Sequence, residues 1–215
     1  IEKPRQWPLR PARVGAINLR VARDVAWFRR DYRGETGRVQ ANGAGRVSPR
    51  VAILLGAHGP APYLSAQLES IAAQTHGNRA LILSFDGDSA KARAQAEAFA
   101  SRNPEARIRL LDGPDAGPMA NYLHLLDHVP PDADHVAFCD HDDVWLPDKL
   151  AANLACLGDA AGAAMTCGRT IICDHALQPF AESPDFRHPP QFRNALLQSL
   201  GGANTMMINR AALEM

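Results

Sequence analysis

The stretch VAFCDHDDVWLPDKL, residues 136–150, joins a short apolar run to three aspartates within four positions. The run predicts a buried strand over 135–139, and the residues from Pro147 onward predict a helix. Three carboxylates in one turn repel one another and are costly to bury, so a divalent cation is expected beside them. Mg²⁺ and Mn²⁺ take oxygen ligands and often share them with a diphosphate. Asp140, Asp142 and Asp143 are therefore candidate metal ligands; capping of the helix is the structural alternative.

Strand and helix patterns alternate on the N-terminal side of this stretch. Strands are predicted at 51–55, 80–85, 107–111 and 135–139, and helices at 63–74, 89–101, 117–128 and 147–157. This order predicts an α/β, Rossmann-like fold whose mainly parallel central sheet carries helices on both faces. Ligands of such sheets bind beyond the carboxyl ends of the strands, where Asp86 and Asp140 fall. The remaining elements expected are a strand over 163–173, a loop over 174–190, a helix over 191–199 and a strand over 204–209.

The charge distribution divides the chain into two domains. The 215 residues are 46% hydrophobic and formally neutral, yet residues 1–50 hold 12 Lys and Arg against 4 Asp and Glu, so the remainder is acidic. Residues 17–32 have the spacing of an amphipathic basic helix, and 33–49 resemble a linker. We expect a basic arm over 1–49 and a main domain over 50–215. The helix either contacts anionic lipids or, as we favour, packs as a solvated face on a neighbouring domain. Nucleic-acid binding is not expected, because the main domain is acidic.

Cysteine usage and hydropathy indicate the compartment. The four cysteines show neither zinc-site nor C-x-x-C spacing, which predicts reduced thiols. No apolar stretch approaches the roughly 20 residues that span a bilayer, and the N-terminal residues lack the apolar core of a signal peptide. We predict a cytoplasmic protein. Association with a membrane through the basic arm is a further alternative.

Five blocks of sequence, in order over residues 50–213, together resemble a known family. They are VAILLGAHGPAPYLSAQLESIAAQTHGN, LILSFDGDS, LLDGPDAGPMANYLHLL, VAFCDHDDVWLPDKL and FRNALLQSLGGANTMMINRAA. They resemble the family 2 glycosyltransferases of the nucleotide-diphospho-sugar transferase (GT-A) fold, nearest the bacterial rhamnosyltransferase-like branch. An ordered series of blocks is far more specific than a lone Asp-x-Asp.

The resemblance implies roles for individual residues. Asp140 and Asp142 would face the ribose and the metal-bound diphosphate of a nucleotide sugar, and Asp86 would recognise the base. The implied set is Ala57, His58, Asp86, Gly117, Asn121, Asp140, His141 and Asp142 for the donor, Asp140, Asp142 and Asp143 for Mg²⁺ or Mn²⁺, and Asn204 and Thr205 on the acceptor side. Two departures reduce the polar contacts to the base: Ala57-His58-Gly59 replaces Thr-Tyr-Asn, and Phe85 replaces an aspartate.

The implied activity is metal-dependent, inverting transfer of a sugar from a nucleotide diphosphate to a saccharide or lipid-linked acceptor in cell-surface polysaccharide synthesis. Rhamnose is the favoured sugar, and transfer from a UDP-hexose is an alternative. The general base of the resembling branch would lie beyond Met215, so no catalytic residue is assigned. The chain is expected to be C-terminally truncated and to turn over poorly.

Two further classes of function remain open. A non-catalytic module that only binds a nucleotide sugar would fit the altered base-recognition residues and the absent base. LILSFDGDS also resembles the start of a haloacid-dehalogenase-type phosphatase, with Asp86 as nucleophile, Asp88 as acid/base and Asp142 and Asp143 as metal ligands. The phosphatase is disfavoured because Lys91 lies too close to Asp88 to steady the phosphoryl intermediate.

Overall fold

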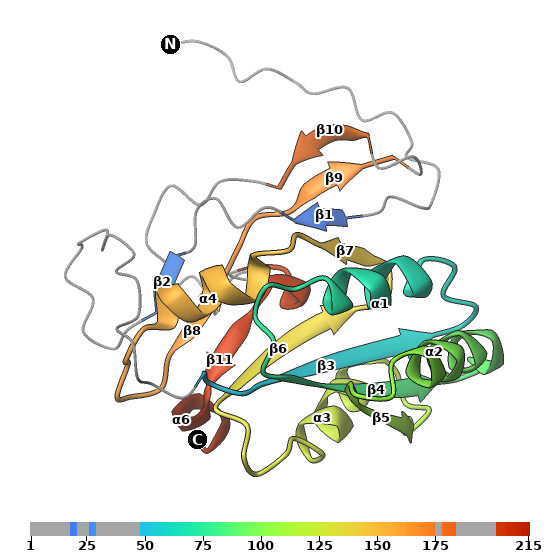
Figure 1. Cartoon of the computed structure of the whole chain (residues 1–215), viewed down its shortest axis with the longest axis horizontal. Coiled ribbons are helices and arrows are strands. Elements are labelled where there is room, and N and C mark those ends of the chain that lie inside the picture. Colours follow the sequence, from blue (N-terminus) through green and yellow to red (C-terminus); the bar gives the residue numbers. More distant parts are fainter. Residues whose placement is uncertain (1–17, 21–25, 29–47, 175–177, 184–200) are drawn as a thin grey trace.

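Strands and helices alternate through the main domain of the computed structural model, which describes residues 18–20, 26–28, 48–174, 178–183 and 201–215 (Figure 1). In order they are β3 (Val51–His58), α1 (Leu64–Ala72), β4 (Arg79–Asp86), α2 (Ala90–Arg102), β5 (Arg107–Asp112), α3 (Pro118–Leu126), β6 (His135–Asp140), β7 (Asp143–Trp145) and α4 (Lys149–Leu157). Every strand and helix predicted between 51 and 157 is confirmed, and β7 was not predicted.

The main sheet has the strand order β2-β8-β11-β6-β3-β4-β5. The four strands β6, β3, β4 and β5 are mutually parallel. The strand β11 (Met207–Asn209) runs antiparallel to β6 and to β8 (Met165–Cys167), and β2 (Ala26–Phe28) runs antiparallel to β8. The predicted α/β, Rossmann-like architecture with a mainly parallel sheet is therefore confirmed.

Helices cover both faces of this sheet (Figure 1). Side chains of α1, α2 and α4 pack with Ile53 and Leu55 of β3 in one hydrophobic cluster. Side chains of α3, joined by Leu213 of α6 (Arg210–Leu213), pack with Ala52 and Leu54 in a second cluster on the opposite face. Because β3 is buried on both faces, its first five residues are a continuous apolar run instead of an alternating one.

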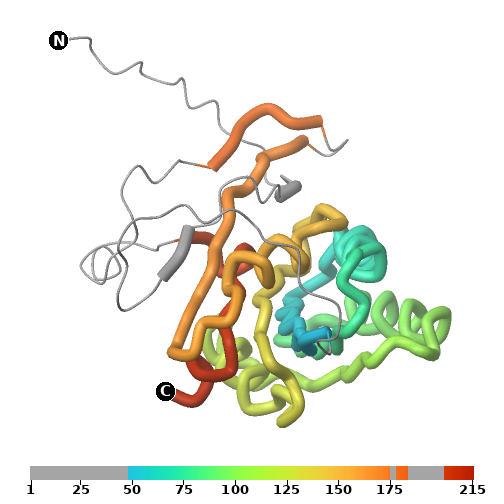
Figure 2. The backbone as a smooth tube through the Cα atoms, turned by 60° about the vertical axis from the view of Figure 1, so that its left-hand side comes forward, coloured from blue at the N-terminus to red at the C-terminus, as the bar shows by residue number. Residues whose placement is uncertain are grey.

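A smaller sheet with the order β10-β9-β1-β7 lies beside the main one. It contains β1 (Asn18–Arg20), β9 (Ile171–Cys173) and β10 (Pro179–Glu182). The strand β1 pairs in parallel with β7, which begins directly after the acidic turn. Figure 2 shows β9 and β10 extending beyond the main body of the molecule.

Four predictions outside the central domain need correction or stay open. A continuous helix over 17–32 is wrong, because Asn18–Arg20 and Ala26–Phe28 are strands that complete the edges of β7 and β8. Backbone pairing with an open edge outweighs a weak helical periodicity here. Membrane contact through the basic arm stays a prediction, because most of the arm lies outside the described residues. The single strand predicted over 163–173 is instead two strands, β8 in the main sheet and β9 in the smaller one. The loop predicted over 174–190 contains the strand β10. The helix predicted over 191–199 lies outside the described residues.

The strand β5 forms one edge of the main sheet. Arg107, Arg109 and Asp112 are exposed there, and the Asp112 carboxylate pairs with Arg93 of α2. Among the described residues, no helix is both long and apolar enough to cross a membrane.

Candidate functional site

The parallel strands bring residues far apart in sequence to one edge of the sheet. Gly56 of β3 is paired with Asp140 of β6, and His58 of β3 is paired with Asp86 of β4. These are the carboxyl ends of the strands, where ligands of parallel sheets bind. The chain adds β4 and β5 on one side of β3 and then crosses over to add β6 on the other side, so the strand order reverses at β3. The predicted candidates from three strands therefore meet at one edge.

Three carboxylates converge at the end of β6. One oxygen each from Asp140, Asp142 and Asp143 lies within 4.8 Å of the other two. Asp143 is fully buried, whereas Asp140 and Asp142 are partly exposed. Hard oxygen donors at this spacing suit Mg²⁺ or Mn²⁺, so the side chains present fit the predicted cation. The N-cap of α4 is Asp148, so the capping alternative does not explain the cluster.

The carboxylate of Asp140 is held by Tyr122 of α3. The Tyr122 hydroxyl lies 2.6 Å from Asp140 Oδ1 and 2.8 Å from the carbonyl oxygen of Cys139. Burial raises the pKa of Tyr122 above its ordinary value, and the charge of Asp140 raises it further, so the phenol stays a neutral donor. Sequence reasoning missed Tyr122. Two features could have indicated it. A mostly buried tyrosine hydroxyl usually has a polar partner, and Tyr122 directly follows the predicted site residue Asn121.

The carboxylate of Asp143 is held from the other end of the chain. Asn204 donates a hydrogen bond from Nδ2 to Asp143 Oδ2 over 2.9 Å. Asn204 lies in a short 3₁₀ helix, Ala203–Thr205, just before β11. The structure thus brings Asn204 to the acidic cluster. Thr205 is 2% exposed and its hydroxyl donates to the carbonyl oxygen of Gly202 at 2.7 Å, so it serves the local turn.

Asp86 is almost fully buried and stabilises the loop between β5 and α3. Its Oδ1 accepts the backbone N–H of Asp115 at 2.6 Å, and its Oδ2 accepts the N–H of Gly117 at 3.0 Å. Gly117 has φ +88°, a left-handed conformation that favours glycine, and is the N-cap of α3. Asp86 therefore fixes the start of α3. Both carboxylate oxygens are engaged, which argues against Asp86 as the nucleophile of a phosphatase.

The two histidines at this edge bond to the backbone. His58 is exposed, and its Nδ1 lies 3.1 Å from the carbonyl oxygen of Asp86. The Nδ1 of His141 lies 3.3 Å from the carbonyl oxygen of Gly56. Ala57 is 1% exposed within the hydrophobic core, so only its backbone is available to a ligand.

Asn121 lies beneath this edge, between α3 and the sheet. It is 3% exposed, and its Nδ2 lies 3.5 Å from the carbonyl oxygen of Ser84. Its Oδ1 and the Ser84 hydroxyl have no hydrogen-bond partner among the described residues. A Cβ on Gly56 would lie 3.3 Å from the Asn121 amide, so glycine allows this close approach of α3. Asn121 is therefore placed against Gly56, the β3 residue that is paired with Asp140.

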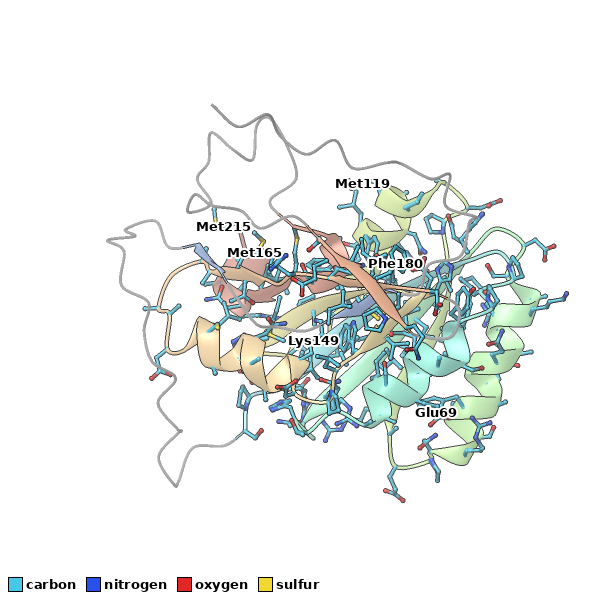
Figure 3. The ribbon with its side chains drawn as sticks, turned by 90° about the horizontal axis from the view of Figure 1, so that it is seen from above. Glu69, Met119, Lys149, Met165, Phe180 and Met215 are labelled. Atoms are coloured by element: carbon cyan, nitrogen blue, oxygen red, sulfur yellow. The ribbon has the colours of Figure 1, made fainter. Side chains whose placement is uncertain are left out.

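Trp145, which follows the acidic cluster, is a core residue. It is 2% exposed, and the Lys149 ammonium lies 3.8 Å from the centre of its ring. Figure 3 labels Lys149, which lies at the start of α4. By contrast Met119 on α3 and Phe180 on β10 are exposed (Figure 3).

A hollow of about 440 Å³ opens at the opposite edge of the sheet, lined in part by Arg50, Arg107 and Arg109. It adjoins Ala80 near the start of β4 and includes none of the three clustered aspartates. The three clustered aspartates and Asp86 lie instead at the carboxyl ends of β6, β3 and β4, which we call the acidic edge.

Comparison with known families decides the class of protein. The pattern of glycosyl transferase family 2 matches residues 53–213, which include nearly all of the five sequence blocks and the whole acidic edge.

The chain belongs to glycosyltransferase family 2.

Relatives of this family 2 chain cover parts of it. The succinoglycan biosynthesis protein ExoW of Rhizobium meliloti (strain 1021) is 39% identical over 69 residues, which are 32% of this chain and 22% of that protein. The mannosyltransferase PcManGT of Pyrobaculum calidifontis, solved in complex with GDP-Man and Mn²⁺, superimposes with a TM-score of 0.50 at 20% identity, over 54% of this chain and 35% of that one. S. aureus TarS 1–349 in complex with UDP-GlcNAc superimposes with a TM-score of 0.41 at 18% identity, over 49% of this chain and 31% of that one. The chain thus spans about a third or less of the length of these relatives.

The family 2 membership and the mannosyltransferase likeness confirm the predicted GT-A fold. The family 2 match by itself agrees with the coarse prediction of a glycosyltransferase, and the phosphatase alternative is not supported. The rhamnosyltransferase branch, the donor, the acceptor and the roles of individual residues stay predictions.

Proposed function

We propose that this glycosyltransferase binds a nucleotide-diphosphate sugar at the carboxyl edge of β6, β3 and β4 and transfers the sugar with inversion. The observation that carries the proposal is the convergence of Asp140, Asp142 and Asp143 within 4.8 Å at that edge. The three carboxylates of this turn repel one another, and a cation shared with a diphosphate would relieve that repulsion.

The proposed cation ligands are Asp142, Asp140 and Asp143. A bound Mg²⁺ or Mn²⁺ acts as a Lewis acid that stabilises negative charge on the departing diphosphate. Asp142 is the best candidate for a direct ligand, because no hydrogen bond or ion pair engages its carboxylate within the described part of the chain. The Mn²⁺ bound in the mannosyltransferase complex supports the choice of ion class.

The remaining site residues are proposed to shape and orient the donor. His58 and His141 flank the end of β3, the backbone of Ala57 lines it, and Asn121 supports it from below. The acceptor is proposed to approach from the side of Asn204 and Thr205. Transfer with inversion needs the acceptor hydroxyl on the face of the sugar opposite the diphosphate. The general base for that hydroxyl is not assigned to any described residue.

The donor is proposed to be a dTDP-rhamnose-like sugar nucleotide, on the resemblance to the rhamnosyltransferase-like branch. A UDP-hexose is the alternative. The part that ExoW takes in succinoglycan biosynthesis supports a saccharide or lipid-linked acceptor in polysaccharide synthesis. All four cysteines are thiols outside any disulfide, which supports work in the reducing cytoplasm.

A non-catalytic nucleotide-sugar-binding module is the second candidate. The engagement of Asp86 by backbone amides favours it, because this leaves fewer side chains to read the base. Measured sugar transfer or steady donor hydrolysis by the full-length protein would exclude it.

Calorimetric titration of the chain with UDP, TDP and GDP, each with and without Mn²⁺ or Mg²⁺, tests the proposal. We expect binding that requires the metal and that weakens at least about tenfold in Asp142→Asn, or about 1.4 kcal/mol. Asp148→Asn is the matched control, because Asp148 is exposed nearby and makes no side-chain cap bond. Equal binding by all three proteins, or binding without metal, would overturn the metal-diphosphate site.

A further inference from the structure

Tyr122 links α3 to the acidic turn. Its hydroxyl lies 2.6 Å from Asp140 Oδ1, closer than the 2.9 Å that separates the Asn204 amide from Asp143. Its ring packs edge-on against Phe138 of β6, with centroids 5.9 Å apart and planes at 69°. The ring is therefore held by packing while the hydroxyl reaches the carboxylate.

The start of α3 is itself fixed. The N–H of Gly117, at the N-cap, is bound by the buried Asp86 carboxylate. Asn121, one residue before Tyr122, packs against β3 and β4. A donor on a helix anchored at these points has little freedom to follow a moving carboxylate, so Asp140 must align with Tyr122.

The alignment matters because Asp140 belongs to a set of like charges. Repulsion from Asp142 and Asp143 favours rotation of Asp140 away from them when no cation is bound. A hydrogen bond on Oδ1 opposes that rotation and leaves Oδ2 available to a cation. Partners that orient the ligands of metals commonly change metal affinity by about 10- to 100-fold when they are removed.

We propose that Tyr122 is a positioning residue that acts through Asp140, holding this carboxylate turned toward Asp142 and Asp143 so that the three can share a divalent cation. The inference rests on the proposed function and deepens it. Tyr122 needs no contact with the sugar nucleotide for this role.

The test uses Mn²⁺ alone, with free Mn²⁺ followed by electron paramagnetic resonance. We expect Tyr122→Phe to weaken Mn²⁺ binding about 10- to 100-fold. In the Asp140→Ala background the same substitution should change the affinity less than about twofold, because the carboxylate that Tyr122 holds is gone. Leu126→Val is the control: it loosens the packing of α3 on the sheet and keeps Phe138 and the Tyr122 hydroxyl, so Mn²⁺ affinity should stay near that of the wild type.

The outcomes separate this inference from the proposed function. Mn²⁺ binding that depends on Asp142 and is unchanged in Tyr122→Phe would overturn the role of Tyr122 and leave the metal site standing. An equal loss with and without Asp140, or an equal loss in Leu126→Val, would show that Tyr122 acts only on folding. If the wild-type chain binds no Mn²⁺, both proposals fail. Thermal melting of each variant without metal identifies any that do not fold.

Discussion

Asn204 donates a hydrogen bond to the buried Asp143 over 2.9 Å, across 61 residues of sequence. This contact ties the short helix before β11 to the beginning of β7, so the segment after 200 is part of the acidic site. The amide is neutral and offers a donor, and it can therefore approach a carboxylate without adding charge to the cluster.

Replacing Asn204 tests this contact. Asn204→Ala should lower the free energy of unfolding by about 1–3 kcal/mol, because a buried carboxylate oxygen loses a donor. Asn204→Asp should lower it further at neutral pH, because a fourth carboxylate then faces Asp143. Urea denaturation with and without Mn²⁺ is the measurement, and Mn²⁺ should restore part of the stability of Asn204→Asp. If both variants were as stable as the wild type, the contact between Asn204 and Asp143 would be contradicted.

Substitution of Asp86 distinguishes two roles for this residue. In Asp86→Asn one carboxylate oxygen becomes an NH₂ group that faces a backbone N–H of the loop between β5 and α3. If Asp86 mainly holds the loop, affinity should fall by a similar factor for UDP, TDP and GDP in calorimetric titration. A loss confined to pyrimidine nucleotides would instead show that Asp86 reads the base. Asp88→Asn, an exposed site two residues later, should leave all three affinities unchanged.

Close packing makes Gly113 sensitive to the addition of one methyl group. A Cβ at this position would lie 2.8 Å from Asp86 Oδ1 and 2.8 Å from the carbonyl oxygen of Phe85. Gly113→Ala should therefore lower the free energy of unfolding by about 1–3 kcal/mol in urea denaturation. The control is Gly77→Ala, where the added Cβ meets nothing within 4 Å. The prediction fails if the two variants are equally stable.

The thiol of Cys139 should be inert in the folded protein. Burial raises its pKa well above the ordinary value, and the charge of Asp143 raises it further, whereas the Gln67 amide 2.7 Å away opposes the shift. The folded chain keeps this proton to higher pH than the unfolded chain does. The contribution of this thiol to the free energy of unfolding is therefore fully present below the unfolded thiol pKa of about 8.5. It is lost as pH rises through the raised pKa of the folded state.

Alkylation with iodoacetamide at pH 8, followed by peptide mass spectrometry, checks this prediction. Cys139 should react in urea and stay unmodified in buffer. The partly exposed Cys156 is the internal comparison, because it should react faster than Cys139 in the folded protein. Rapid modification of Cys139 without denaturant would contradict the buried position.

Sequence patterns predicted the central domain well because its strands and helices differ clearly in period. The run at Val51–Leu55 is apolar on both faces, which only a fully buried strand requires, and it became β3. The three aspartates were recognisable because such local charge density needs a partner. Their convergence depended only on the short turn between β6 and β7, which sequence proximity already guarantees.

The rest depended on contacts between distant segments. Nothing local to Ala26–Phe28 distinguishes a strand from a helix, and the open edge of β8 decides the outcome. The contacts Tyr122 to Asp140 and Asn204 to Asp143 require the position of α3 and of the segment before β11, which a single sequence does not give. The role of Asp86 was likewise hidden, because its partners are backbone amides, which every sequence supplies.

The exposed strand β5 has a bearing on how the molecule behaves in concentrated solution. An unpaired strand is a template onto which another chain can add, and this is a common origin of aggregation. Arg107 and Arg109 stand on that strand, and Asp112 ends it. A second copy that added a strand there would have to remove the charged side chains of these arginines from water, which costs free energy. The outer margin of the sheet is thus protected by charge against the addition of another strand.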